Sequence, residues 1–85
     1  MLVIDNEPDI RKGLDNILQL WGSRVITAAD LKDALEQLTS KNQQPDIIIS
    51  DYRLKEGKTG VDAIKALHLA FNKPIPALII TGDTA

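Results

Sequence analysis

Acidic and hydroxyl side chains stand at the ends of three short apolar runs, and their chemistry is the most informative feature of the sequence. Asp5, Asp51 and Thr81 occupy these positions. A carboxylate can attack phosphorus to give an aspartyl phosphate when a metal offsets charge on the transferring group. A threonine hydroxyl can donate a hydrogen bond to a phosphoryl oxygen. Brought together, the three residues could accept a phosphoryl group.

Apolar runs alternate with segments of helical period, which indicates βαβ units and a parallel sheet covered on both faces. The predicted strands are Met1 to Ile4, Val25 to Ala28, Ile47 to Ile49 and Ala77 to Ile80. The predicted helices run from near Pro8 to Gly22, from the N-cap Asp30 to the polar stretch that starts at Ser40, and from Val61 to about Phe71. The isoleucine strand is so β-branched that both its faces should be covered, near the sheet centre.

Each predicted helix has one apolar face that should turn toward the sheet. For the first helix this face is Ile10, Leu14, Ile17, Leu18 and Trp21. For the second it is Leu31, Ala34, Leu35 and Leu38, and for the third Val61, Ile64, Leu67 and Phe71.

The alternation predicts an α/β fold with a doubly wound, flavodoxin-like parallel sheet of strand order 2-1-3-4. In that order the first strand lies beside the third, and ligands bind outside the carboxyl ends of the strands. Asp5 and Asp51 would then be neighbours on strands about 4.8 Å apart, and their charges would repel unless a proton or cation is shared. Magnesium, which takes oxygen ligands and one or two carboxylates, suits this cluster.

Asp51 is the predicted nucleophile, because a rigid apolar strand holds its backbone while the following polar loop leaves its side chain open. That loop, from Asp51 to Gly60, is long enough to be functional. His68 falls in the third helix, remote in order from the strand ends, and is expected to be an ordinary, partly buried histidine. Trp21 is expected in the core or as a hydrophobic lid.

Composition excludes several other functions. The chain has 85 residues, 44% of them hydrophobic, which suits one domain with a modest core. It has no cysteine, so disulfides, thiolate metal sites and cysteine nucleophiles are excluded. The net charge is -2 and basic residues are scattered, which disfavours direct nucleic-acid binding. No apolar run could span a bilayer, so we expect a cytoplasmic segment, although a longer parent chain could be membrane-tethered.

Four sequence blocks resemble, in order and spacing, those of response-regulator receiver domains: LVIDNEPDI, IIISDYRL, GVDAI and LIITGDTA. The resemblance implies that Asp51 is the phosphorylated residue, that Thr81 is the switch hydroxyl, and that Mg2+ is the cofactor. It also implies metal ligation by Asp5, by Asn6 at the second acidic position, by Asp51 and by the backbone carbonyl of Arg53.

The sequence departs from that family at two points. Asn6 stands where the family usually has a second carboxylate, and an amide oxygen is a weaker ligand for a hard cation. The family lysine that follows a fifth strand has no counterpart here. Residues 1–85 are therefore read as a receiver domain incomplete at its C-terminal end, without the fifth strand and last helices. The exposed edge of the last strand could allow self-association.

The function expected from the resemblance is phosphorelay signalling rather than conventional enzyme catalysis. A histidine kinase or phosphotransfer protein would supply the phosphoryl group from a phosphohistidine. The segments DYRL and TGDTA are similar to the corresponding segments of receiver domains in hybrid sensor histidine kinases. Two alternatives stay open: a pseudo-receiver that is not phosphorylated, and a metal-dependent hydrolase, which is disfavoured because Arg53 stands where a second aspartate would be expected.

Overall fold

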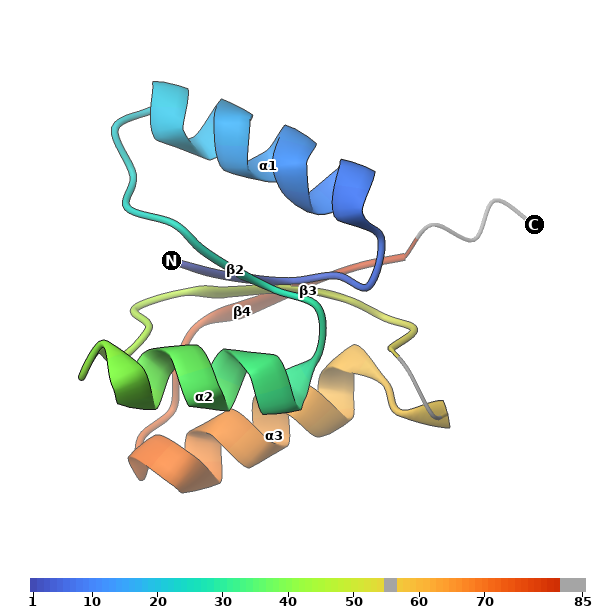
Figure 1. The fold of residues 1–85 in the computed structure, drawn as a ribbon. Helices are drawn as coiled ribbons and strands as arrows, with labels where there is room; N and C mark the ends of the chain where they lie inside the picture. The colour runs from blue at the N-terminus through green and yellow to red at the C-terminus, as the bar shows by residue number, and fades with distance from the viewer. Residues whose placement is uncertain (55–56, 82–85) are drawn as a thin grey trace.

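A four-stranded parallel sheet organises the computed structural model, which describes residues 1–54 and 57–81. The elements are β1 (Leu2–Ile4), α1 (Pro8–Leu20), β2 (Ile26–Ala28), α2 (Leu31–Ser40), β3 (Ile48–Asp51), α3 (Gly60–Phe71) and β4 (Ala77–Ile80). The strand order is β2-β1-β3-β4, and every pair is parallel. The predicted fold class and strand order are confirmed. In Figure 1, α1 lies on one side of the sheet and α2 and α3 lie on the other.

Local capping explains where α2 and α3 begin and where α3 ends. The Asp30 side chain accepts the backbone N–H of Asp33 at 2.8 Å, so the predicted N-cap of α2 is confirmed. At the start of α3, Thr59 and Asp62 form a reciprocal capping box. Asn72 ends α3 in the left-handed conformation, with φ 52°.

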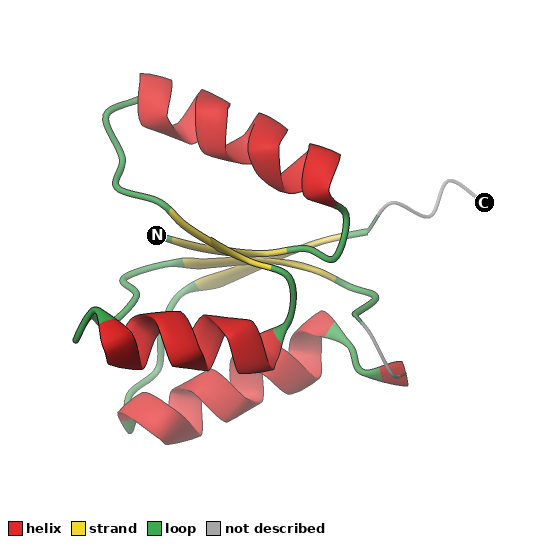
Figure 2. Ribbon diagram, in the orientation of Figure 1, coloured by secondary structure: helices red, strands yellow, loops and turns green. Residues whose placement is uncertain are grey.

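The main core lies between the sheet and the helices α2 and α3, which appear below the strands in Figure 2. The sheet contributes Leu2, Ile4 and Ile48 to it, all fully buried. The helices contribute Ala34, Leu38, Ala63 and Leu67. Leu31, Leu35, Ile64 and Phe71 pack against its margin, half-buried. Val61 is exposed, so its predicted inward position is wrong, and Ala63 takes that place.

The other face of the sheet is covered only in part. Val3 is fully buried there, and Leu18 is the buried residue of α1. Ile10 and Ile17 are exposed, so their predicted inward position is wrong. Trp21 is 76% exposed, so a place in the core is wrong for it too. The reason is that α1 packs on β1 and β2, and no other helix of the described residues lies on this face to cover the far side of its apolar face (Figure 1).

The isoleucine strand also differs from the prediction. It extends to Asp51, which is the last residue of β3 rather than the first residue after it. Ile48 is fully buried but Ile49 is half-buried and Ile47 is exposed, so only one face of β3 is fully covered. Within the described ranges, no helix is long and apolar enough to cross a membrane.

Candidate functional site

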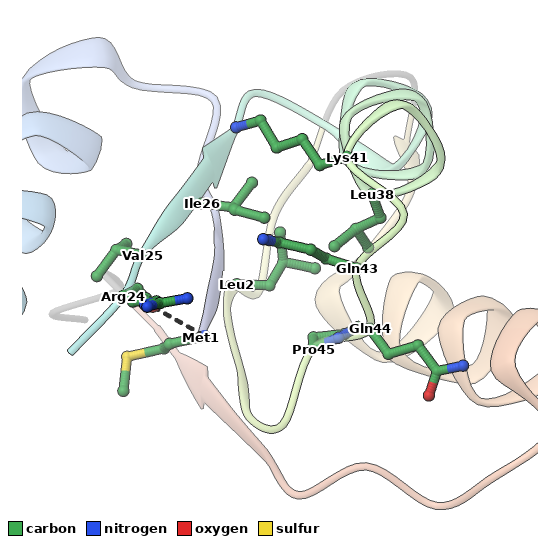
Figure 3. Close-up of a pocket in the computed structure, with 10 residues that line it drawn as sticks. All are labelled: Met1, Leu2, Arg24, Val25, Ile26, Leu38, Lys41, Gln43, Gln44 and Pro45. Carbon is green, nitrogen blue, oxygen red and sulfur yellow. Dashed lines mark hydrogen bonds between the residues drawn. The ribbon is translucent and has the colours of Figure 1, made fainter.

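A cavity of about 230 Å³ lies at the amino ends of β1 and β2, far along the strands from Asp51. Its lining includes Ile26 and Leu38, with Arg24 and Lys41 among the polar side chains (Figure 3). None of the predicted site residues contributes to this lining. Ligands of doubly wound sheets bind outside the carboxyl ends of the strands, which is the opposite end. The cavity is therefore separate from the candidate site.

The register of the sheet brings the predicted acidic residues side by side. Ile4 of β1 pairs with Ser50 of β3, so the next residues, Asp5 and Asp51, stand at the same level on adjacent strands. Asp51 in turn pairs with Ile80 of β4, which places Thr81 one residue beyond that level. The structure thus gathers all three residues at one end of the sheet, as the strand order predicted.

Asp5 is almost enclosed, with 8% of its surface exposed. Its Oδ1 accepts the backbone N–H of Glu7 at 2.9 Å, and its own backbone oxygen accepts Arg11 Nη1 at 2.6 Å. Burial raises the pKa of the Asp5 carboxyl above its ordinary value, and the negative charge of Asp51 raises it further. The Glu7 N–H and the Arg11 charge act in the opposite direction without cancelling the rise. The two carboxylates are therefore close enough to repel.

The backbone around Asp51 is held on three sides, while its side chain stays half-buried. Ser50 Oγ, itself fully buried, donates to the Asp51 carbonyl oxygen at 3.0 Å. The Tyr52 N–H donates to Ile80 O at 2.9 Å, and the Tyr52 carbonyl accepts the Gly60 N–H at 2.7 Å. The nucleophile predicted from the sequence thus sits on a fixed backbone at an open strand end.

The remaining predicted ligands lie in loops next to this pair. Asn6 is exposed directly after Asp5. Arg53 forms an isolated antiparallel bridge with Thr59, and the Leu54 N–H donates to Lys58 O at 2.9 Å. The chain after β3 therefore folds back on itself, which fixes the backbone that carries the Arg53 carbonyl. Residues 55 and 56 of this loop, and residues 82–85 after Thr81, lie outside the described part of the chain.

The donor set fits a magnesium ion in kind, although it is sparse. Among the residues that the structure describes, no group of three or more His, Cys, Asp and Glu could hold a metal. The predicted ligands are instead two carboxylates, an amide and a backbone carbonyl. Magnesium commonly binds through one or two carboxylates, with water and phosphate oxygens completing its shell. A divalent cation would also offset the repulsion from Asp51, which adds to the rise that burial gives the pKa of Asp5.

Three residues of the site were not anticipated: Arg11, Ser50 and Gly60. Arg11 lies one turn inside α1, where a cation is unfavourable to the helix dipole, and that mismatch was a signal. Ser50 is the polar exception in a strand of isoleucines. Gly60 adjoins the capping residue of α3. His68 behaves as predicted, because it is half-buried and its Nε2 lies 2.9 Å from Ile75 O, far from Asp51 along the fold.

Comparison with known proteins places this geometry in one family. The response regulator receiver domain family matches residues 1–85. The chain is 28% identical to the phyllosphere-induced regulator PhyR of Methylorubrum extorquens, over 98% of this chain and 33% of the relative. It is 32% identical to the C4-dicarboxylate transport transcriptional regulatory protein DctD of Pseudomonas aeruginosa, over 96% of this chain and 17% of the relative. The chain thus spans at most about a third of these curated relatives.

Solved structures agree with the family match. The chemotaxis response regulator CheY4 of Vibrio cholerae superposes with a TM-score of 0.81 at 33% identity, over 99% of this chain and 68% of the other. The anti-anti-sigma factor PhyR of Bartonella quintana superposes with a TM-score of 0.75 at 25% identity, over 92% of this chain and 31% of the other. The chain belongs to the response regulator receiver domains of two-component signalling.

Proposed function

We propose that the chain accepts a phosphoryl group on Asp51 from a phosphohistidine of a histidine kinase or phosphotransfer protein, in a reaction that needs Mg2+. The observation that carries this proposal is that Asp5 and Asp51 stand side by side at the carboxyl ends of β1 and β3, each one residue beyond the pair Ile4–Ser50. Burial raises the pKa of Asp5, and the charge of Asp51 is close enough to raise it further. Two carboxylates held together in this way favour a cation and, through it, a phosphoryl group.

The chemistry is a displacement at phosphorus. A carboxylate oxygen of Asp51 forms the new P–O bond, the P–N bond breaks, and its electron pair stays on the imidazole nitrogen of the donor. Asp5, Asn6 and the Arg53 carbonyl would hold the metal, which supplies charge neutralisation when bound. The Thr81 hydroxyl would donate a hydrogen bond to a phosphoryl oxygen. Hydrolysis of the acyl phosphate later restores the free carboxylate.

Phosphorylation changes the charge at one end of the sheet. The aspartyl phosphate carries more negative charge than the carboxylate, and it stands beside the nearly enclosed Asp5. Thr81 directly follows β4, so a hydrogen bond to the phosphoryl group would pull on that strand's end. The output we propose is a shift of the β4 end between two positions, biased by phosphorylation.

The test is phosphorylation of the full-length protein by a small acyl phosphate in the presence of Mg2+, followed by intact mass measurement. One phosphoryl group should be added, and both Asp51→Asn and chelation of the metal should abolish the addition. Asp46→Asn is the matched control, because Asp46 is exposed and lies at the other end of β3. It should leave the adduct unchanged. No adduct on the wild-type protein would sink the proposal.

A pseudo-receiver that acts by protein binding alone is the second candidate, and the exposed Asn6 in place of a carboxylate favours it. Asn6→Asp separates the two functions. In a phosphorylated receiver, the added carboxylate should lower the Mg2+ concentration required for phosphorylation. In a pseudo-receiver, the variant should gain metal affinity without any adduct on Asp51.

A further inference from the structure

The first turn of α3 lies directly against the backbone of the proposed phosphoacceptor. A Cβ added at Gly60 would stand 2.6 Å from the Asp51 carbonyl oxygen and 3.0 Å from Ser50 Oγ. Real Cβ contacts are essentially never shorter than 3.0 Å. The nearer obstacle is backbone, which cannot rotate aside as a side chain can. Space alone thus requires glycine at this position.

This close approach completes a set of hydrogen bonds around one peptide unit. Ser50 Oγ donates to the Asp51 carbonyl, and the Tyr52 N–H of the same peptide unit donates to Ile80 O. The Gly60 N–H donates to the next carbonyl, that of Tyr52, at 2.7 Å. Strand β4 and helix α3 therefore both hold the chain immediately after the Asp51 side chain.

We infer that Gly60 is a positioning residue for the Asp51 site: its missing side chain lets α3 fix the peptide between Asp51 and Tyr52 and the backbone leading to Arg53. It acts through this backbone and does not touch the phosphoryl group. The inference rests on the proposed function, because it concerns how that site is held.

A methyl group at position 60 must displace either α3 or the chain after β3. The helix is the less movable partner, because Thr59 and Asp62 cap it and Ala63 and Leu67 anchor it in the core. The displacement should therefore fall on Tyr52 and Arg53. That would move the proposed carbonyl ligand away from Asp5 and Asp51, and the site would bind Mg2+ less tightly.

The experiment compares Gly60→Ala with the wild type in the full-length protein. The first readout is the free Mg2+ concentration that gives half the maximal rate of phosphorylation by a small acyl phosphate. The second, without any donor, is the rise in unfolding temperature on adding Mg2+. We expect the half-saturating Mg2+ concentration to increase about tenfold, as for other residues that support a metal ligand. The rise in unfolding temperature on adding Mg2+ should become smaller.

Two control variants separate positioning from general stability. Gly13→Ala adds a Cβ inside α1 where, apart from its chain neighbours and the adjacent helix backbone, no atom of the described residues lies within 4 Å. It should raise the unfolding temperature without changing the Mg2+ dependence. Leu38→Val removes a methylene from the buried core beside the cavity of Figure 3. It should lower the unfolding temperature and leave the half-saturating Mg2+ concentration unchanged.

If Gly60→Ala has the same half-saturating Mg2+ concentration and the same phosphorylation rate as the wild type, the inference is overturned and the proposed function is left intact. A wild-type protein that forms no adduct would overturn the proposed function, and the Mg2+-dependent unfolding temperature would still test the positioning role. Should Gly60→Ala fail to fold, Ser50→Ala removes the other contact to the Asp51 carbonyl without adding an atom. It should raise the Mg2+ requirement in the same direction, and wild-type behaviour would overturn the inference.

Discussion

On the face of the sheet that α2 and α3 cover, Ile4 and Ile48 are fully buried, whereas on the face of α1 Leu78 is 60% exposed. Leu78 pairs with Ile49, which pairs with Val3, so these three side chains share the α1 face. Val3 is fully buried and Leu78 is not. On this face the side chains therefore become more exposed from β1 toward β4.

The difference shows that an apolar stripe specifies a helix but not how much of it is buried. Both α1 and α2 carry apolar residues at helical spacing, yet α1 leaves Ile10 and Ile17 exposed. Two helices share the four strands on one face, and α1 rests on β1 and β2 on the other. Burial depends on the surface that the rest of the molecule presents.

The largest effect is expected from truncating a side chain on the fully covered face. Leu67→Ala leaves a cavity under the sheet and should lower the free energy of unfolding by about 2–5 kcal/mol. The matched variant Ile17→Ala, at a side chain 48% exposed on α1, should cost about 1 kcal/mol or less. Urea unfolding of both measures the contrast. Equal losses would show that the two faces are equally packed.

Helix capping should give the next largest contrast. Thr59→Ala removes the capping box of α3 and should cost about 1 kcal/mol. Glu7, the N-cap of α1, makes no side-chain capping bond to any described residue, so Glu7→Ala should change stability by only a few tenths of that. Thermal unfolding of the two variants tests this, and a larger loss for Glu7→Ala would contradict it.

A smaller, pH-dependent effect is expected at Asp5, directly after the end of β1. Its pKa is raised in the folded protein, mainly by burial. The folded state therefore holds this proton more tightly than the unfolded state, and the resulting stability is fully present below the ordinary pKa of 3.8 and lost as pH rises through the folded value.

Asp5→Asn removes this dependence, because an amide carries no charge at either pH. In buffer without divalent cations, the variant should gain stability relative to the wild type at pH 7, and the gain should disappear at pH 3. Unfolding temperatures at the two pH values measure it. Asp9→Asn, at an exposed position in the first turn of α1, should show no such gain. A lower unfolding temperature for Asp5→Asn than for the wild type at pH 7 would contradict this prediction.

The smallest effect is expected on the open part of the α1 face. Leu78→Ser exchanges an exposed apolar side chain and should change the free energy of unfolding by about 0.5 kcal/mol or less. A loss several times larger, dependent on protein concentration, would show that a second copy covers this face.

Local signals in the sequence were enough to predict the helices and strands and to bring Asp5, Asp51 and Thr81 to the same end of the sheet. Asp30 and Asn72 lie where capping chemistry puts helix ends, and the parallel order followed from the alternation of apolar runs and helical segments. Asp5 and Asp51 could be paired because strand order alone makes them neighbours. The assignment to a hybrid kinase stays a prediction.

Other features depend on contacts between distant segments. Ser50 and Gly60 meet at the Asp51 carbonyl only after β3 and α3 have packed, and no local pattern encodes that distance. The exposure of Trp21 depends likewise on what else covers the sheet. Glycine at the edge of a capping box was visible in the sequence, but its steric reason was not.

The position of β1 has a consequence for the order in which the protein forms during synthesis. β1 pairs with β2 on one side and β3 on the other, and its partner residues in β3 follow more than forty residues later. Until then a nascent chain holds only two parallel strands of three residues each, too few for an independently stable sheet. The strand that completes the centre of the sheet also ends in Asp51. One strand therefore completes the centre of the sheet and brings the proposed phosphoacceptor to its end.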